Sequence, residues 1–119
     1  DRTSSADCDM VLKVDEVVLA TTKEGFLCDA SLWHEKVAIA LAQIEQIELT
    51  DDHWEILLFI RGYYLQFKHL PNARMFVSAV RKAFGEDKGN SRYLQKLFPQ
   101  GPLKYACKIA GLPKPPTCL

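Results

Sequence analysis

Along the first 30 residues, hydrophobic and polar positions follow each other as they do in short strands. Residues 11–14 and 17–20 alternate weakly and are rich in valine, and Asp15-Glu16 between them suits a tight turn. From Asp29 onward, apolar residues recur at helical spacing instead. The pattern predicts a small N-terminal β-hairpin followed by a helical domain.

Capping residues, prolines and glycines divide the helical region into about five helices. Asp29 or Ser31 is expected to cap the first helix, and Thr50 the second. Pro71 fits the first turn of the third helix, and Gly85 ends it. The predicted helices cover about residues 31–46, 51–67, 71–84, 91–97 and 102–110. We therefore expect a mainly α fold, an orthogonal bundle of about five helices with the hairpin at its N-terminus.

The second predicted helix, residues 51–67, contains a glycine in its interior. Gly62 costs roughly 1 kcal/mol there against alanine, so a close neighbour or a bend is expected at this position. The side chains expected to pack inward are those of Trp54, Leu57, Leu58, Tyr64 and Leu65.

The end of the chain, LPKPPTCL, is unsuited to helix or sheet. Gly111 is expected to end the last helix in a left-handed conformation, and the three prolines that follow favour an extended arm. Extended, the 11 steps from Cys107 to Cys118 could span about 36 Å. We therefore divide the chain into a disordered tail at 1–9, a helical domain at 10–106 and a mobile arm at 107–119 that carries both cysteines.

Length and composition indicate one domain with a hydrophobic core. The chain has 119 residues, of which 48% are hydrophobic. No stretch approaches the roughly 20 apolar residues of a membrane span, and the N-terminus lacks a charged-then-apolar leader. A cytoplasmic protein is expected, without a membrane partner.

The net charge of zero hides an opposition between the two halves of the chain. Residues 1–59 carry 4 Lys and Arg against 13 Asp and Glu, which gives −9; residues 60–119 carry 11 against 2, which gives +9. This polarity indicates either a surface oriented toward a partner or simply two solvated faces of one domain.

Four cysteines are present, namely Cys8, Cys28, Cys107 and Cys118. They form no CxxC pair and no cluster with histidine, so we expect no metal site and no cofactor. Cytoplasmic thiols normally stay reduced. Cys28 is therefore expected to be buried and inert, and Cys8 to lie in the flexible tail.

Cys118, next to last in the chain, could be a reactive group on a projecting arm. A thiolate is a good nucleophile and leaving group, so this cysteine could carry sulfur as a persulfide into another protein's pocket. Lys108 and Lys114 would favour the thiolate, whereas the C-terminal carboxylate opposes it. Cys107 could then attack the loaded cysteine and form a disulfide, if the Cα atoms come within about 7 Å. The alternative is a buried structural Cys107 and an incidental Cys118.

The terminal motif CKIAGLPKPPTC resembles the signature of the DsrC/TusE family. These are the gamma-subunit-like proteins of dissimilatory sulfite reductase and their relatives in tRNA thiolation. The resemblance extends through LTDDHWEILLFIRGYYLQF, GNSRYL and LFPQGPLKYA and covers about residues 11–119. It implies a helical domain with a hairpin and a mobile arm. It also implies that Cys118 carries sulfur and forms an intramolecular disulfide or trisulfide with Cys107.

Two features distinguish the branches of this family. Members that work with sulfite reductase have both cysteines, whereas tRNA-thiolation members typically keep only the terminal one. The loop GEDKGNS resembles an insertion of sulfur oxidisers and of tRNA-thiolation members. One departure is that Pro115-Pro116-Thr117-Cys118 replaces the common Pro-Thr-Gly-Cys, which stiffens the tip and weakens the case for a fold-back disulfide.

We therefore expect a sulfur carrier of dissimilatory sulfur metabolism, acting as protein co-substrate of a DsrAB-like sulfite reductase. Its sulfur would come from or go to a DsrEFH- or TusBCD-like sulfurtransferase. The alternative is a TusE-like relay in tRNA 2-thiouridine synthesis. Basic residues expected to contact partners are Lys104, Lys108, Lys114 and Arg92.

An alternative from another class is a helix-turn-helix DNA-binding regulator. The helices near 71–84 and 91–98 would supply phosphate contacts, although their connection is longer than a tight turn and no side chain is obviously aimed at base edges. DNA is therefore not the expected partner. The candidate phosphate contacts are Arg74, Arg81, Lys82, Lys88, Arg92 and Lys96. The histidines expected at helix ends or on the surface, rather than in a site, are His34, His53 and His69.

Overall fold

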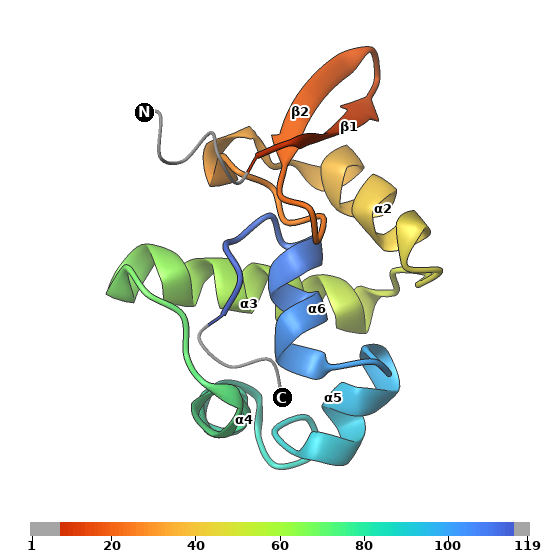
Figure 1. Ribbon diagram of the computed structural model, residues 1–119. Helices are drawn as coiled ribbons and strands as arrows, with labels where there is room; N and C mark the ends of the chain where they lie inside the picture. Colours follow the sequence, from red (N-terminus) through yellow and green to blue (C-terminus); the bar gives the residue numbers. More distant parts are fainter. Residues whose placement is uncertain (1–7, 116–119) are drawn as a thin grey trace.

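The computed structural model of the protein describes residues 8–115 and shows a hairpin on a bundle of five α-helices. The elements are β1 (Met10–Val14), β2 (Val17–Thr21), the 3-10 helix η1 (Ala30–Leu32), α2 (Glu35–Ile44), α3 (Asp51–Phe67), α4 (Ala73–Phe84), α5 (Ser91–Leu97) and α6 (Pro102–Ile109). Figure 1 shows α6 at the centre, where it contacts α2, α3, α4 and α5. The expected mainly α fold is confirmed.

The hairpin forms as its sequence predicts. β1 and β2 pair antiparallel from Met10 opposite Thr21 to Val14 opposite Val17. Asp15 and Glu16 both adopt positive φ, of 51° and 71°, which is the conformation of the two-residue turns that match the twist of paired strands.

The first predicted helix is divided in two. Asp29 caps the short η1, where its carboxylate accepts a hydrogen bond from the Ser31 amide, and Trp33 then adopts an extended conformation. The α-helix α2 begins only at Glu35 and ends at Ile44. The break lets the Trp33 side chain reach α6, a long-range contact that helical periodicity cannot reveal.

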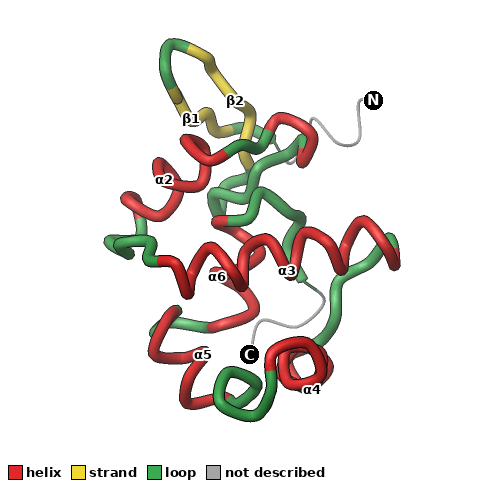
Figure 2. Tube along the Cα trace, turned by 180° about the vertical axis from the view of Figure 1, so that it is seen from behind, coloured by secondary structure: helices red, strands yellow, loops and turns green. Residues whose placement is uncertain are grey.

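The long helix α3 crosses behind α6, and Figure 2 shows it in front when the molecule is seen from behind. Leu57 is buried as expected, together with Ile56 and Ile60. The expectation for Leu58 and Leu65 is wrong, because these side chains are 58% and 63% exposed. Their positions on the helix turn them away from the α6 side.

Gly62 has no close neighbour, which was one of the two features expected at this position. A Cβ atom built at this glycine would meet nothing within 4 Å. It lies beside a hollow of about 670 Å³ between α3 and α4.

The start of α3 is fixed by a histidine. The Nδ1 atom of His53 accepts a hydrogen bond from the Thr50 amide at 3.1 Å, and its Nε2 atom lies 2.8 Å from the Leu97 carbonyl oxygen. Because a carbonyl only accepts, Nε2 carries the proton. His53 therefore lies at a helix end as expected, but it is buried and joins α3 to α5.

Asparagines begin the two helices that follow α3. The side chain of Asn72 accepts from the Met75 amide at the start of α4, and that of Asn90 accepts from the Tyr93 amide at the start of α5. Pro71 precedes the cap, so its expected place in the first turn of α4 is wrong. Pro102 is the first residue of α6, the helix that leads into the C-terminal arm.

In the described part of the chain, no helix combines the length and the apolar character needed to cross a bilayer.

Candidate functional site

Cys107 lies in the last turn of α6 and is completely buried, with 0% of its surface exposed. It is the free cysteine among the residues that the structure describes. Removal from water disfavours the thiolate, so burial raises the pKa of Cys107 to about 12. In this arrangement the thiol is shielded from solvent and protonated near neutral pH.

The chain leaves α6 through a glycine-based C-cap. The Leu112 amide donates to the Cys107 carbonyl at 3.0 Å, and the Gly111 amide donates to the Lys108 carbonyl at 3.2 Å. Gly111 has a φ of +73°, as expected from the sequence. These two bonds form the Schellman motif, in which the left-handed residue turns the chain back toward the helix. Leu112 is buried as well, so the first residues after the helix belong to the core.

Two side chains from other elements bind the next carbonyl groups. The Trp33 Nε1 atom donates to the Ile109 carbonyl at 2.8 Å, and the Arg61 Nη1 atom donates to the Ala110 carbonyl at 2.8 Å. Together with the Schellman bonds, they satisfy the carbonyl groups that the end of a helix leaves unpaired. We call Trp33 and Arg61 the root clamp, because they hold the root of the C-terminal arm.

The root clamp is itself a packed unit. The guanidinium of Arg61 lies 4.4 Å from the centre of the Trp33 ring, and its Nη2 atom donates to the Ala30 carbonyl at 3.3 Å. Burial lowers the pKa of Arg61 from its ordinary value. A Cβ atom on Gly111 would lie 2.4 Å from Trp33 Cδ1, so glycine is required both for its φ and for this close approach.

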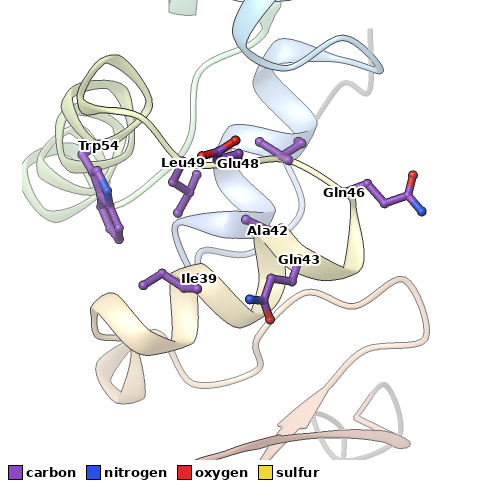
Figure 3. A pocket seen from close by; sticks show the side chains of 8 residues that line it. Ile39, Ala42, Gln43, Gln46, Glu48, Leu49 and Trp54 are labelled. Atoms are coloured by element: carbon purple, nitrogen blue, oxygen red, sulfur yellow. The ribbon is translucent and has the colours of Figure 1, made fainter.

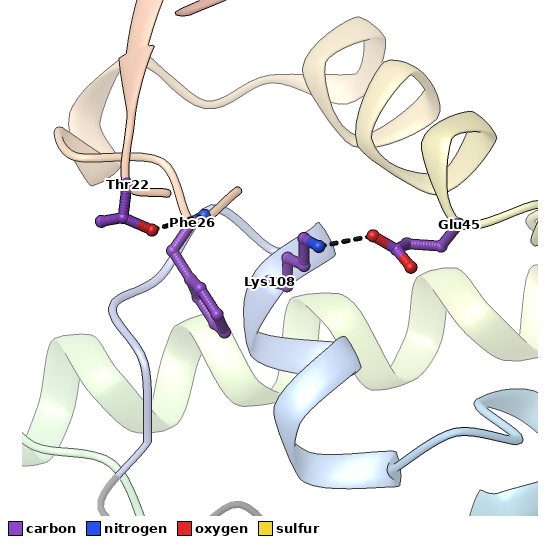
Figure 4. Close-up of polar contacts among 4 residues, drawn as sticks. All are labelled: Thr22, Phe26, Glu45 and Lys108. Atoms are coloured by element: carbon purple, nitrogen blue, oxygen red, sulfur yellow. Dashed lines mark hydrogen bonds and ion pairs between the residues drawn. The ribbon is translucent and has the colours of Figure 1, made fainter. Parts of the chain in front are cut away.

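Lys108, expected to contact partners and to favour a thiolate, is instead buried. Only 8% of the residue is exposed, and its ammonium forms an ion pair with Glu45 at the end of α2 (Figure 4). Its Nζ atom also lies 5.5 Å from the centre of the Tyr105 ring. The pKa of Cys107 is raised by burial, and the neighbouring lysine does not offset that rise. Lys108 therefore fixes α6 to α2 and is not a surface residue.

The other three basic candidates lie on three different segments of the chain. Lys114 lies on the described part of the arm and pairs with Glu24 at 3.1 Å, while Lys104 is half-buried on α6 beside Tyr105. Arg92 is exposed on α5. Their part in partner binding stays a prediction.

Cys118 lies outside the described residues, so its predicted sulfur-carrying role rests on its sequence position. Cys107 and the arm root through Pro115 are the parts of the candidate site that the structure describes.

The N-terminal cysteines differ from expectation. Cys8 and Cys28 form a disulfide with a Cα–Cα distance of 6.4 Å, and Cys28 is exposed. The prediction of a buried, inert Cys28 and an unattached Cys8 is therefore wrong. The two residues are 20 positions apart, on either side of the hairpin, and that separation carries no pairing signal in the sequence.

The basic residues of the helix-turn-helix alternative are partly engaged inside the molecule. Lys88 pairs with Glu55 at 2.5 Å, and the Nε atom of Arg81 donates to the Gly89 carbonyl at 3.1 Å. The connection between α4 and α5 is six residues long, from 85 to 90. These contacts leave fewer cations for phosphate groups than the sequence suggests.

A hollow of about 500 Å³ lies between the end of α2 and the start of α3. Figure 3 shows Trp54 and Ile39 on one side of it and Gln43 on another. Its lining holds no cysteine or histidine. Within residues 8–115, no group of three or more His, Cys, Asp or Glu side chains is arranged to hold a metal ion.

The structure thus defines a small helical domain with a buried thiol directly before a fixed arm root. A family model described as DsrC like protein matches residues 13–119, and the chain belongs to this family. The match includes both Cys107 and Cys118.

Similar proteins come from several bacteria and an archaeon. The sulfurtransferase TusE homolog of Haemophilus influenzae is 50% identical over 109 residues, which cover 92% of this chain and 100% of the relative. The sulfurtransferase TusE of Escherichia coli K12 is 50% identical over 101 residues, covering 85% of this chain and 93% of the relative.

Solved structures share the fold. The NMR structure of Allochromatium vinosum DsrC has a TM-score of 0.84 at 43% identity. The crystal structure of the oxidized gamma-subunit of dissimilatory sulfite reductase from Archaeoglobus fulgidus has a TM-score of 0.78 at 42% identity. Each match covers 92% of this chain and 100% of the other.

Proposed function

We propose that this protein is a sulfur carrier that binds sulfur as a persulfide on Cys118. The observation that carries the proposal is the family match, which runs to residue 119 and so includes the penultimate cysteine. The names of the sulfurtransferase relatives support it. The fixed arm root is also consistent with it, because a rigid base gives the residues beyond it a defined starting point on the domain.

Loading is a transfer of sulfane sulfur between two thiols. The Cys118 thiolate attacks the outer sulfur of a donor protein's cysteine persulfide, which forms a new sulfur–sulfur bond and breaks the donor's bond. The donor cysteine leaves as a thiolate, so the exchange needs no external oxidant or reductant. Delivery to an acceptor thiol is the same reaction with the carrier as donor.

Cys107 supplies a second reaction in this proposal. Its thiolate attacks the Cys118 sulfur of the persulfide and forms the Cys107–Cys118 disulfide, while the outer sulfur leaves as hydrosulfide. The two thiols are oxidised and the sulfane sulfur is reduced, so the electrons balance. With a pKa of about 12, roughly one Cys107 in 10⁵ is ionised at pH 7 in the buried state, so this step waits for α6 to open.

Two physiological settings fit this chemistry. The presence of Cys107 and the likeness to DsrC structures favour a carrier of dissimilatory sulfur metabolism, exchanging sulfur with a DsrAB-like sulfite reductase and a DsrEFH-like sulfurtransferase. The 50% identity to TusE proteins favours a relay in tRNA 2-thiouridine synthesis, supplied by a TusBCD-like sulfurtransferase. In both settings the protein acts in the cytoplasm as a co-substrate of larger enzymes.

Intact-protein mass spectrometry after incubation with a protein persulfide donor tests the carrier function. We expect a gain of one sulfur mass in the wild type and in Cys107→Ser, and no gain in Cys118→Ser. Equal loading of Cys118→Ser would contradict the proposal.

The two settings differ in the step that follows loading. After loading, thiol-blocked peptide mapping measures the Cys107–Cys118 disulfide and an electrode measures released hydrosulfide. Equal amounts of both favour the reductase-linked role. Stable persulfide that is passed on only to an acceptor thiol favours the relay.

A further inference from the structure

The end of α6 is held partly by side chains from outside the helix. Trp33 from the segment after η1 and Arg61 from α3 bind the carbonyls of Ile109 and Ala110, and Arg61 also binds Ala30. A helix of eight residues has few internal hydrogen bonds of its own, so its last turn depends strongly on such contacts.

These contacts act on the turn that contains Cys107. Cys107 is two positions before Ile109, the last residue of α6, and its own carbonyl accepts the hydrogen bond from Leu112. Release of Ile109 and Ala110 would free Gly111 and Leu112, which lie against the same core. The buried thiol and the clamped carbonyls therefore belong to one cooperative turn.

We infer that Trp33 and Arg61 are positioning residues that keep the last turn of α6 closed and thereby set how often the Cys107 thiol becomes available for reaction. The inference rests on the proposed function only in naming Cys118 as the reaction partner. Opening of the clamp exposes Cys107 to water and restores an ordinary thiol; closing buries it again. The clamp thus sets whether the carrier keeps its sulfur or proceeds to the disulfide.

Labelling of Cys107 by iodoacetamide tests the clamp without any sulfur chemistry. The experiment uses a Cys118→Ser background, and mass spectrometry identifies the alkylated peptide. Trp33→Phe removes one hydrogen-bond donor of the clamp but keeps an aromatic ring. Arg61→Met removes the other donor and keeps a similar length. We expect each to raise the Cys107 labelling rate about tenfold, because one buried hydrogen bond to the turn is lost. Arg61→Lys, which keeps the charge and one donor direction, should fall between Arg61→Met and the wild type.

Three control variants separate local opening from general loss of stability. Trp54→Phe and Arg81→Lys change the same residue types away from the arm root, and Arg81 binds the Gly89 carbonyl instead. Val80→Ala weakens the core in α4 and should lower the free energy of unfolding, measured in urea, without raising the labelling rate. Unchanged labelling in both clamp variants, or an equal rise in Val80→Ala, would overturn the inference.

Oxidised glutathione on the full chain links the clamp to the second cysteine. Cys118 attacks glutathione disulfide and releases one glutathione; Cys107 then attacks Cys118 and releases the other, which leaves the intramolecular disulfide. We expect clamp variants to form the mixed disulfide at the wild-type rate and to close the internal disulfide about tenfold faster. If the mixed disulfide forms normally but the internal disulfide closes at the wild-type rate, the role of the clamp is contradicted and the carrier function is not. Failure of the persulfide-loading experiment rejects the carrier function alone.

Discussion

The two ends of the described chain hold a cysteine in opposite ways. Near the hairpin, Cys28 is exposed and is bound covalently to Cys8. Near the arm, Cys107 is free and is kept from solvent by packing and hydrogen bonds. A covalent link holds whether or not the surroundings pack well, whereas a buried thiol is only as unreactive as its surroundings are closed. The C-terminal end is therefore the one whose reactivity neighbouring side chains can control.

The largest expected effect comes from breaking the ion pair between Lys108 of α6 and Glu45 at the end of α2. Glu45→Ala leaves the buried Lys108 ammonium without its partner, and we expect the free energy of unfolding to fall by about 4 kcal/mol. Urea denaturation followed by circular dichroism measures it. Combining Glu45→Leu with Lys108→Met should recover most of the loss, because neither charge is then buried.

A surface ion pair provides the matched control. Lys36 and Asp15 lie 3.0 Å apart with side chains 69% and 59% exposed, so Lys36→Ala should cost less than about 1 kcal/mol. If Glu45→Ala costs no more than Lys36→Ala, the ion pair of Lys108 does not anchor α6.

The next largest effect concerns the disulfide between Cys8 and Cys28. Cys8→Ser opens a link that spans 20 residues, and loop entropy predicts a loss of about 3 kcal/mol in the free energy of unfolding. The same urea experiment, with and without a reducing agent, measures it. Neither cysteine belongs to the root clamp, and the clamp reaches this region only through the Ala30 carbonyl that Arg61 binds, so we expect Cys107 labelling to stay at the wild-type rate. A Cys107 labelling rate that rises with Cys8→Ser would show that the two ends are coupled.

A pair of glycine substitutions sharpens the comparison within the helical domain. Gly111→Ala places a methyl group against Trp33 at a positive φ, and we expect a loss of about 2 kcal/mol together with faster Cys107 labelling. Gly62→Ala, in open space within α3, should gain about 1 kcal/mol from helix propensity. Thermal denaturation ranks the two, and a stabilising Gly111→Ala would show that the arm root adapts freely.

The last prediction is a pH dependence caused by the buried thiol. Burial raises the pKa of Cys107 to about 12, so between about pH 9 and 12 the unfolded chain releases this proton while the folded chain retains it. Stability is fully present below about pH 9 and falls above it, by at most about 1.4 kcal/mol per pH unit. Unfolding measured from pH 8 to 10.5 should show this extra slope in the wild type and lose it in Cys107→Ala. Identical slopes in the two proteins would contradict the burial of the thiol.

Local chemistry made much of the fold predictable. The turn at Asp15-Glu16, the caps at Asn90 and Gly85, and the left-handed Gly111 depend on a few neighbouring residues, and all are found where the sequence places them. Helical spacing likewise reveals that residues 51–67 form one helix. It does not reveal which stripe of that helix faces α6, because apolar residues occur on both sides.

The candidate site was predictable only in part, because its main contacts join distant segments. Position 107 stands out from the terminal motif, but its burial depends on how α6 packs. Trp33 and Arg61 are 76 and 49 residues from the carbonyls they bind. Glu45 is 63 residues from Lys108, and no local pattern marks such pairs. An arginine within the otherwise uncharged stretch 56–67 was the one available signal for the root clamp.

Leu112 is part of the core and Pro115 is buried as well, so while the root clamp is closed the reach of Cys118 starts no earlier than Leu112. Six residue steps separate Leu112 from Cys118, and a fully stretched chain covers about 20 Å over that length. In the proposed function, a partner of the closed form must therefore bring its own reactive group within this radius of the arm root. Such a partner therefore contacts the surface of the domain around the arm root as well as the arm itself.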